Sequence, residues 1–364
     1  MKKSLIGALA VTSTLLSPMT AMAQTEVHFW HAFTGRLGEL VKGQVADFNA
    51  SQNDYVVVES HKGNYSETLN AGIAAFRAKE QPHILMVFEV GTATMMAAGG
   101  AIKPVYEVMA ESGASFDSDA YIGAVKGYYT TTEGEMLSLP FNSSTPVLWV
   151  NRDAMSAAGV DPDTDMSTWE QVDDVLAKLK AGGEDCPLVT AWQSWIHLEN
   201  FSAYHNVPFA SKDNGFAGLD TELMLNGEAQ VAHLSKMAEW AKDGKFIYTG
   251  RRNEGGANFR SGECALFTES SAGYAGISSE AKFDFEVRPL PYWKAIASSP
   301  QNTIIGGASL WVMSGHSDAE YKGAGEFLSF LSTSDVQAAW HQNTGYLPIT
   351  AEAGEATRAS GFYD

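Results

Sequence analysis

The sequence predicts an α/β fold of two lobes, in which each lobe is a mostly parallel sheet flanked by helices. The chain has 364 residues and is 45% hydrophobic, which is enough to bury a large core. At about 150 residues per domain, that length predicts two lobes. Short apolar runs also alternate with helix-period segments, first near the N-terminus and again from residue 169 onward.

The first 23 residues differ from the rest of the chain. Lys2 and Lys3 precede an apolar run, and Ala21-Met22-Ala23 is a small-residue cleavage site. This pattern predicts a secretory signal peptide over residues 1–23 and a periplasmic protein. Its removal would change the formal net charge from −19 to −21, because the segment holds two lysines and no acid. So acidic a chain argues against nucleic acid or anionic lipid as a partner.

The first lobe is predicted from apolar strands that alternate with amphipathic helices. Between the strands, apolar residues recur at helical spacing, as at Leu37, Leu40 and Val41. Strand, helix, strand in this order predicts a parallel sheet with right-handed crossovers. The expected strands are 26–33, 55–60 and 84–90.

The second lobe repeats the same pattern. A helix over 169–183 precedes the strand 187–192, and a helix over 228–244 precedes the strand 264–270. These elements again predict a parallel sheet covered by helices.

Two strands carry residues that are unusual for a sheet. In the stretch 141–151, FNSSTPVLWVN, hydroxyl side chains and Pro146 directly precede an apolar strand. In the stretch 302–315, Gly306 and Gly307 interrupt a second apolar strand. Proline, glycine and polar residues are unusual inside central strands. Their presence here predicts that the chain crosses between the lobes in these two stretches and forms a hinge beside a ligand cleft.

Polar groups follow the predicted strands where each one ends. In open α/β sheets ligands bind beyond these carboxyl ends, because loops and helix N-termini gather there. Hydroxyls, aromatics, an acid and glycines suit a small polyhydroxyl or anionic ligand. The segments concerned are 34–35, 62–65, 89–91, 192–195 and 269–273.

Two cysteines, Cys186 and Cys264, each open an apolar run in a chain predicted to be exported. If the two runs are neighbouring parallel strands, their first residues lie side by side. We predict a disulfide between them. The alternative is two buried free thiols, which a thiol titration of the denatured, unreduced protein would reveal.

Several longer motifs are more specific. In order along the mature chain, they closely resemble the periplasmic sn-glycerol-3-phosphate-binding receptors of ATP-driven importers, a branch of extracellular solute-binding protein family 1. The resemblance implies a type II periplasmic binding protein that closes on glycerol 3-phosphate and delivers it to a membrane permease. The motifs are KGNY (62–65), AGIAAFR (71–77), EVGTATMMAA (89–98), AIKPVY (101–106), PFNSSTPVL (140–148), PQNTIIGGASLWVM (300–313) and HQNTGYLPIT (341–350).

The resemblance also implies the lobe bounds and the partners. Residues 24–142 and 306–345 would form lobe 1, and residues 143–305 and 346–364 lobe 2. We expect a monomer with no cofactor.

The family's site residues map onto seven positions. Tyrosine and serine hydroxyls and a glycine amide would donate to phosphate, and Glu89 would accept from the glycerol hydroxyls, since a carboxylate repels phosphate. Trp192 matches the aromatic wall under the carbon chain. The full set is Tyr65, Glu89, Ser144, Trp192, Ser270, Gly307 and Tyr346.

The match departs from the family at the end of the chain. Receptors of this kind continue beyond GFYD with further helices and an arginine that grips the phosphate, so the resemblance implies a truncated receptor. Arg358 is not at the matching place and is not assigned to the site.

Other functions predict other residues. No nucleophile elbow, zinc-protease motif or phosphate loop stands in the sequence, so an enzyme would have to use paired carboxylates, with Glu89 and Glu269 as the pair. A turnover assay on glycerophosphodiesters tests this. A sugar receptor of the same fold and a signalling or vestigial receptor are nearer alternatives. His28 and His31 lie on opposite faces of one strand and predict no metal site.

Overall fold

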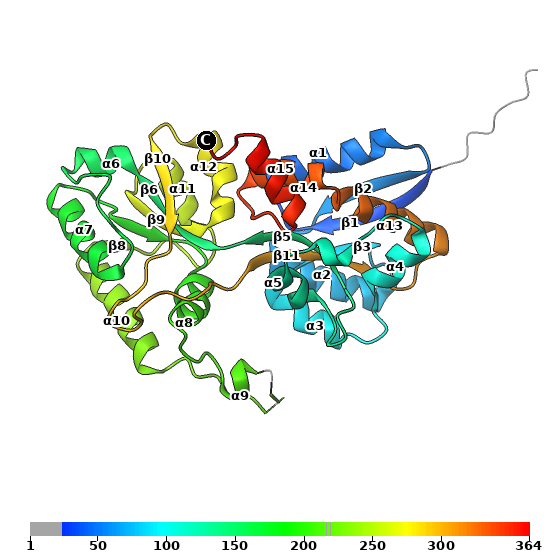
Figure 1. Ribbon diagram of the computed structural model, residues 1–364, viewed down its shortest axis with the longest axis horizontal. Helices are drawn as coiled ribbons and strands as arrows, with labels where there is room; N and C mark the ends of the chain where they lie inside the picture. The colour runs from blue at the N-terminus through cyan, green and yellow to red at the C-terminus, as the bar shows by residue number, and fades with distance from the viewer. Residues whose placement is uncertain (1–23, 216, 219) are drawn as a thin grey trace, which may run out of the picture.

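The computed structural model describes residues 24–215, 217–218 and 220–364, which fold into two lobes side by side (Figure 1). The predicted signal peptide lies outside the described residues. Each lobe has its own sheet between helices, as the sequence predicts. Among the described residues, no helix has both the length and the apolar character that crossing a bilayer requires.

The sheet of the first lobe is mixed rather than purely parallel. Its strand order is β2-β1-β3-β11-β4, and β5 pairs with β11. The β2-β1-β3 part is parallel, whereas β11 runs antiparallel to its neighbours because it enters from the second lobe. The strands are β1 (Thr25–His31), β2 (Tyr55–His61), β3 (Ile84–Phe88), β4 (Ile102–Lys103), β5 (Leu139–Ser144) and β11 (Gly306–Met313).

The sheet of the second lobe has the order β10-β6-β9-β7-β8. Strands β7 and β9 are parallel neighbours as predicted, β8 adds a further parallel strand that was not predicted, and β6 and β10 add antiparallel pairs at one side. The strands are β6 (Pro146–Asn151), β7 (Leu188–Thr190), β8 (Phe246–Ile247), β9 (Leu266–Ser270) and β10 (Phe285–Pro289).

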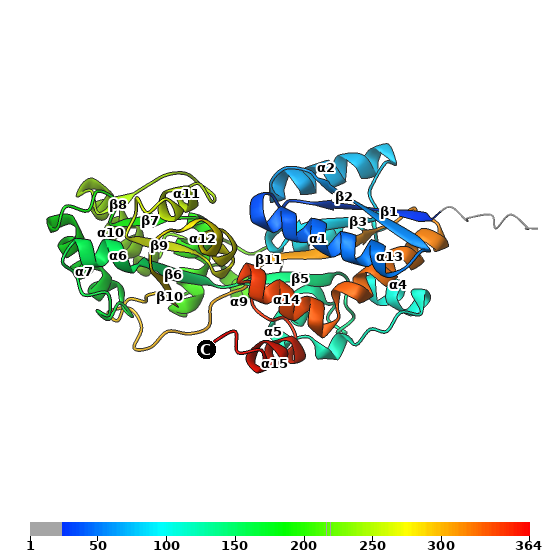
Figure 2. The ribbon, with the colours of Figure 1, turned by 90° about the horizontal axis from the view of Figure 1, so that it is seen from above.

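Helices flank both sheets (Figures 1 and 2). Short 3-10 turns occupy Glu89–Gly91, Ser118–Ala120, Gly127–Tyr129 and Ser271–Gly273, and a π-helical turn occupies Trp195–Asn200. In the first lobe the helices are α1 (Gly35–Ser51), α2 (Tyr65–Ala78), α3 (Thr92–Ala97), α4 (Val105–Ser112), α5 (Gly123–Lys126), α13 (Asp318–Leu331), α14 (Ser334–Thr344) and α15 (Ala351–Ala359). In the second they are α6 (Arg152–Ala157), α7 (Trp169–Ala181), α8 (Phe201–Tyr204), α9 (Ser211–Asn214), α10 (Glu228–Lys242), α11 (Gly255–Arg260) and α12 (Tyr274–Glu280).

The stretch 141–151 is the first crossing between the lobes. It forms the end of β5 in one sheet and the whole of β6 in the other, with Thr145 between them. The second crossing leads into β11, and the Thr145 and Thr303 hydroxyls meet at 2.7 Å where the two crossings run together. Figure 2 shows β5 and β11 side by side at the junction. The hydroxyls and Pro146 therefore lie at a hinge, not within a continuous strand.

The last segment of the chain packs on the first lobe. Ile349 belongs to the first-lobe core and its carbonyl accepts the Ile122 amide at 2.9 Å, while Thr350 forms a β-bridge with Tyr121. We therefore propose that residues 346–359 belong to lobe 1, where the sequence placed 346–364 in lobe 2. The other predicted bounds remain a proposal.

A disulfide joins Cys186 and Cys264, the pair that the sequence predicted. The cysteines precede the parallel neighbours β7 and β9, and the Ala265 amide donates to the Cys186 carbonyl at 3.0 Å. The bond closes a loop whose ends are 78 residues apart.

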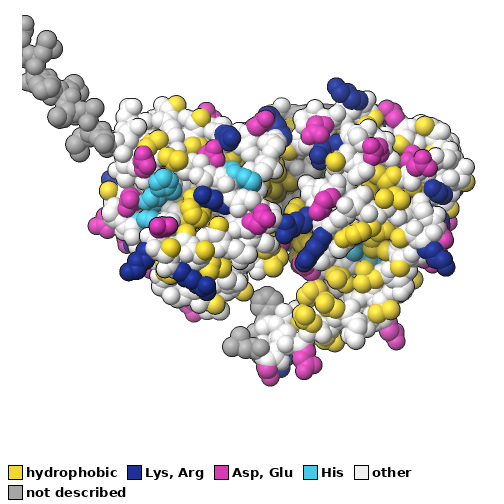
Figure 3. Space-filling model, turned by 180° about the vertical axis from the view of Figure 1, so that it is seen from behind, with side chains coloured by type: hydrophobic (Ala, Val, Ile, Leu, Met, Phe, Trp, Pro, Cys, Tyr) yellow, Lys and Arg dark blue, Asp and Glu magenta, His cyan; other side chains and the backbone are white. Residues whose placement is uncertain are grey.

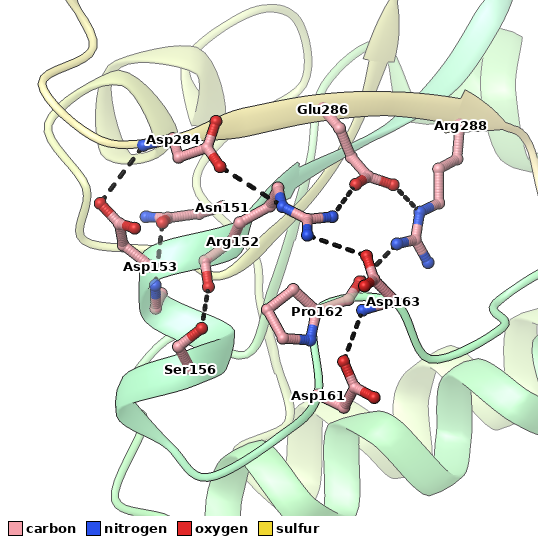
Figure 4. Close-up of polar contacts among 11 residues, drawn as sticks. Asn151, Arg152, Asp153, Ser156, Asp161, Pro162, Asp163, Asp284, Glu286 and Arg288 are labelled. Carbon is pink, nitrogen blue, oxygen red and sulfur yellow. Dashed lines mark hydrogen bonds and ion pairs between the residues drawn. The ribbon is translucent and has the colours of Figure 1, made fainter.

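Ion pairs between charged side chains hold the edge strand β10 of the second sheet in place (Figure 4). Arg152, just after β6, pairs with Asp163 at 2.8 Å, with Asp284 at 3.4 Å and with Glu286. Arg288 also pairs with Glu286 and donates to two carbonyls of the loop before α7. Such networks hold a partly exposed edge better than isolated pairs do. The edge strand β10 is thereby held to the loop.

Candidate ligand-binding cleft

The carboxyl ends of β1, β3, β7 and β9 face the space between the lobes. Seen from behind, the molecule is hollowed there, and both basic and acidic side chains lie along the rim (Figure 3). A cavity of about 630 Å³ also opens where α1, α12 and α14 meet, and Arg36, Tyr274 and Asn343 are among the residues that line it. None of the seven predicted site residues lines this cavity, although Gly35, which follows the first predicted strand, does.

Tyr65 is placed on the first-lobe wall by the start of α2. Asn64 caps this helix and forms a capping box with Glu67, so the chain enters the helix at Tyr65 in a fixed direction. The Tyr65 ring stacks on Phe88, with the ring centroids 5.4 Å apart. Burial raises the pKa of Tyr65 to about 12, which keeps the hydroxyl protonated and able to donate.

The Tyr65 hydroxyl meets two further side chains. Asn142 Nδ2 donates to it at 3.3 Å, and Tyr346 lies within hydrogen-bonding reach. Burial raises the pKa of Tyr346 well above 10, and the neighbouring Tyr65 adds to the rise. The structure thus brings Tyr65 and Tyr346 together around Asn142.

Glu89 and Gly307 are in direct contact. The Gly307 amide donates to Glu89 Oε2 at 3.1 Å. Burial raises the pKa of Glu89 to about 7, although the Gly307 hydrogen bond favours the ionised form. In this structure the Gly307 amide is therefore engaged by Glu89, whereas the sequence assigned it to phosphate.

Only glycine fits at position 307. Its φ is +126°, and a Cβ atom there would lie 2.0 Å from the Asn142 carbonyl oxygen. The second glycine, Gly306, pairs with Ser144 across β5 and β11, and the Trp195 indole packs on it. Ser144 is thus buried at the floor of the cleft, beside the hinge.

The second-lobe wall is built at the end of β9. Ser270 Oγ accepts the Ala272 amide at 3.0 Å, which leaves the hydroxyl proton free to donate. Glu269 is buried next to it and accepts the Ser270 amide at 2.7 Å. Burial raises the pKa of Glu269 to about 8, against hydrogen bonds from Ser270 and Trp192.

Trp192 stands at the end of β7 in a strained conformation. Its φ is +45°, which is rare for a residue other than glycine, and its amide donates to the Arg252 carbonyl at 2.7 Å. Strain of this kind is often kept at ligand sites. Trp192 also contacts Glu269, so it belongs to the same wall as Ser270.

The two walls meet at the hinge. The Ser271 amide donates to the Thr145 carbonyl at 2.8 Å, and the Leu347 amide donates to the Ser143 carbonyl at 2.7 Å. The charge of Glu269 helps to raise the pKa of Tyr346 across the gap between the walls. We therefore propose that the seven predicted residues, which lie at strand ends and crossings around the junction of the two lobes, form the ligand site.

Sequence reasoning missed two residues of this cleft. Asn142 stands two positions before Ser144 in the quoted motif, but a polar residue within a strand does not reveal which face it occupies. Glu269 was named at a strand end and as a possible enzymatic acid, but it was not assigned a role in ligand binding. Arg358, which the sequence analysis set aside, is exposed on α15.

One group of side chains among the described residues, His83, His316 and Glu320, gathers closely enough to hold a metal. It lies at the opposite end of β3 from Glu89. His83 Nδ1 accepts the His28 amide at 2.8 Å, so a neutral ring carries its proton on Nε2, 3.2 Å from the Glu320 carboxylate. A metal ligand needs that nitrogen bare, so the arrangement favours a close polar contact between His83 and Glu320 over a metal site.

Residues 43–360 match the family of bacterial extracellular solute-binding proteins. The fold is similar to a Mycobacterium tuberculosis UgpB solved with glycerophosphocholine, with a TM-score of 0.77, 20% identity, and coverage of 92% of this chain and 85% of that one. A maltose-bound Thermotoga maritima MalE3 also gives a TM-score of 0.77, at 16% identity over 93% and 85% of the two chains.

Two relatives are far closer in sequence. Both are named sn-glycerol-3-phosphate-binding periplasmic protein UgpB. The Yersinia enterocolitica protein is 48% identical over 98% of this chain and 81% of its own length. The Salmonella typhimurium protein is 49% identical over 98% of this chain and 82% of its own length. The chain therefore belongs to the bacterial extracellular solute-binding proteins, and within them to the sn-glycerol-3-phosphate-binding periplasmic proteins.

Proposed function

We propose that the protein captures sn-glycerol 3-phosphate in the interlobe cleft and delivers it to the permease of an ATP-driven importer. The observation that carries the proposal is the meeting of Tyr65, Asn142 and Tyr346 on one wall, with Glu89 beside them. Protonated hydroxyls can donate to phosphate, and a carboxylate can accept from the glycerol hydroxyls. A site for a phosphoglycerol needs both kinds of group, donors for the phosphate and an acceptor for the glycerol hydroxyls.

The remaining residues extend this proposal. Ser144 and Ser270 would donate to the ligand from the floor and the second wall, and Trp192 would cover the carbon chain. Gly307 would then act mainly by letting the backbone approach and by holding Glu89. As solute-binding proteins are receptors, the ligand should be returned unchanged.

Isothermal calorimetry tests the ligand. Glycerol 3-phosphate should bind more tightly than glycerol by at least about tenfold, because the hydroxyl donors otherwise lose their charged acceptor. Glycerophosphocholine, maltose and inorganic phosphate complete the panel. Equal affinity for glycerol and glycerol 3-phosphate, or a preference for maltose, would overturn the proposed ligand. Phosphorus NMR of the incubated ligand would expose any turnover.

Delivery requires a second measurement. Membrane vesicles that contain the permease of a closely related importer but no periplasmic proteins should take up labelled glycerol 3-phosphate only when the protein is added. Binding without uptake would point to a signalling receptor instead.

A further inference from the structure

Asn142, at the proposed cleft wall, has a deeply buried side chain with only one of its two polar atoms hydrogen-bonded. It lies in β5 with 2% of its surface exposed. Its Nδ2 donates to the Tyr65 hydroxyl, but its Oδ1 has no partner among the described residues. A buried amide oxygen without a partner is costly in a folded protein, so the oxygen calls for a hydrogen-bond donor from outside the chain.

The direction of the Asn142 hydrogen bond decides what Tyr65 can do. An amide NH₂ only donates, so the Tyr65 oxygen accepts and the Tyr65 proton remains available. The neighbouring Tyr346 hydroxyl also donates toward the Tyr65 oxygen, so the Tyr65 proton can go to an anionic ligand. Asn142 therefore occupies the Tyr65 oxygen as an acceptor and leaves its hydroxyl proton free for a ligand.

The backbone around Asn142 holds this arrangement rigid. Asn142 pairs with Ala308 in the ladder between β5 and β11, and Gly307 packs directly on its carbonyl oxygen. The Asn142 amide nitrogen also borders Gly307, whose own amide is bound by Glu89. Asn142 thus stands between the hydroxyl donors and the carboxylate acceptor of the proposed site.

We propose that Asn142 is a further ligand-contacting residue with two tasks. Its Nδ2 turns the Tyr65 proton toward the phosphate, and its Oδ1 accepts a hydroxyl of the glycerol moiety. This inference rests on the proposed function, because it assumes a ligand that carries both an anionic group and hydroxyls.

The decisive variant is Asn142→Asp, which keeps the shape and reverses the polarity. An ionised Asp accepts the Tyr65 proton, so Tyr65 no longer donates to the phosphate, and the new charge repels the ligand. At pH 8, calorimetry should show glycerol 3-phosphate binding about 10- to 100-fold more weakly than in the unchanged protein. Asn70→Asp, exposed on α2, adds the same charge and should stay within about twofold.

Acidification should reverse the loss. A protonated Asp carries a hydroxyl that can again donate to Tyr65, so the ratio of variant to unchanged affinity should recover to within about threefold by pH 5. The titratable groups near position 142 are Tyr65 and Tyr346, which hydrogen-bond to Asn142, Glu89, which binds Gly307, and Glu269, which acts on Tyr346. All four occur in both proteins, so the ratio isolates the new carboxyl. A purely structural role would not give a loss that depends on pH.

A second variant keeps the inference testable if the first one does not fold. If Asn142→Asp does not fold, Asn142→Ala removes both contacts and should weaken glycerol 3-phosphate about tenfold with an intact near-ultraviolet CD spectrum. An affinity within threefold at pH 8 for either folded variant, or a loss in Asn142→Asp that stays constant to pH 5, overturns the inference. If the unchanged protein itself does not bind glycerol 3-phosphate, the proposed function fails instead.

Discussion

At the scale of single residues, the cleft places two carboxylates where an anion is proposed to bind. Glu89 and Glu269 stand on opposite walls, and burial raises the pKa of the first to about 7 and of the second to about 8. Each carboxylate also accepts a backbone amide, from Gly307 or Ser270. Near neutral pH both side chains are therefore partly protonated, which lessens their repulsion of a phosphate dianion.

Glu89→Gln tests the role of the first carboxylate. An amide only half replaces an acceptor of hydroxyl protons, so glycerol 3-phosphate should bind about tenfold more weakly, while inorganic phosphate, which has no glycerol hydroxyls, should not. Calorimetry with both ligands measures the difference. Glu355→Gln, exposed on α15, is the control and should change neither affinity. Equal weakening of both ligands would assign Glu89 to the phosphate.

At the scale of the elements, glycines decide how closely the crossing strands approach. Gly307→Ala would bring a Cβ atom within 2.0 Å of the Asn142 carbonyl at a φ of +126°. The change should lower the free energy of unfolding by about 2 kcal/mol or more. Gly43→Ala is the matched control, because it lies in α1 with no atom within 4 Å of its new Cβ. That variant should gain up to about 1 kcal/mol. Urea unfolding curves of the two variants check both signs.

The disulfide between β7 and β9 makes a second prediction at this scale. Closing a loop of 78 residues should stabilise the protein by about 4 kcal/mol, because the unfolded chain loses freedom. Cys186→Ser with Cys264→Ser should lower the melting temperature measured by calorimetry, and reductant should lower it in the unchanged protein but not in this variant. Equal melting temperatures would show that the bond constrains little.

The elements also show how far a sequence can be interpreted. The strands from β1 to β3 and helices α7 and α10 follow from local periodicity, which each segment carries in itself. The disulfide needed one further assumption, that the two runs opened by cysteines are neighbouring parallel strands. The burial of Asn142 and the packing of Ile349 on the first lobe depend on distant segments, and no local pattern records them. The antiparallel direction of β6 could not be predicted either, because it depends on where the crossing enters the second sheet.

At the scale of the whole molecule, buried histidines and buried carboxyls determine how the free energy of unfolding depends on pH. In the second lobe, Trp293 donates to His233 Nδ1 at 2.9 Å, so His233 carries its proton on Nε2 and donates to His197 Nδ1 at 3.1 Å. A further proton on either ring has no acceptor. Burial lowers the pKa of His197 to about 3 and that of His233 well below 6.5.

These shifts have opposite signs for stability. The histidines have depressed pKa values, so their contribution is present above about pH 6.5 and is lost as the pH falls below it. The carboxyls of Glu89 and Glu269 have raised pKa values, so their contribution is present below about pH 4.5 and is lost as the pH rises toward 7 and 8. The ligand-free protein should therefore be most stable on the acid side of neutrality.

The alkaline side gives the sharper test, because between pH 6.5 and 8 the histidines are already neutral and the two carboxyls are still losing protons. The free energy of unfolding from urea titrations should fall there by about 1 kcal/mol per pH unit. In a Glu89→Gln, Glu269→Gln variant neither position can ionise, so the fall should largely vanish and the variant should gain on the unchanged protein as the pH rises. Exposed Glu352→Gln with Glu355→Gln removes the same charge from α15 and should keep the slope. A slope that survives the cleft variant would mean that the two carboxyls are not buried as acids in the folded protein, and the electrostatic account of the cleft would fail with it.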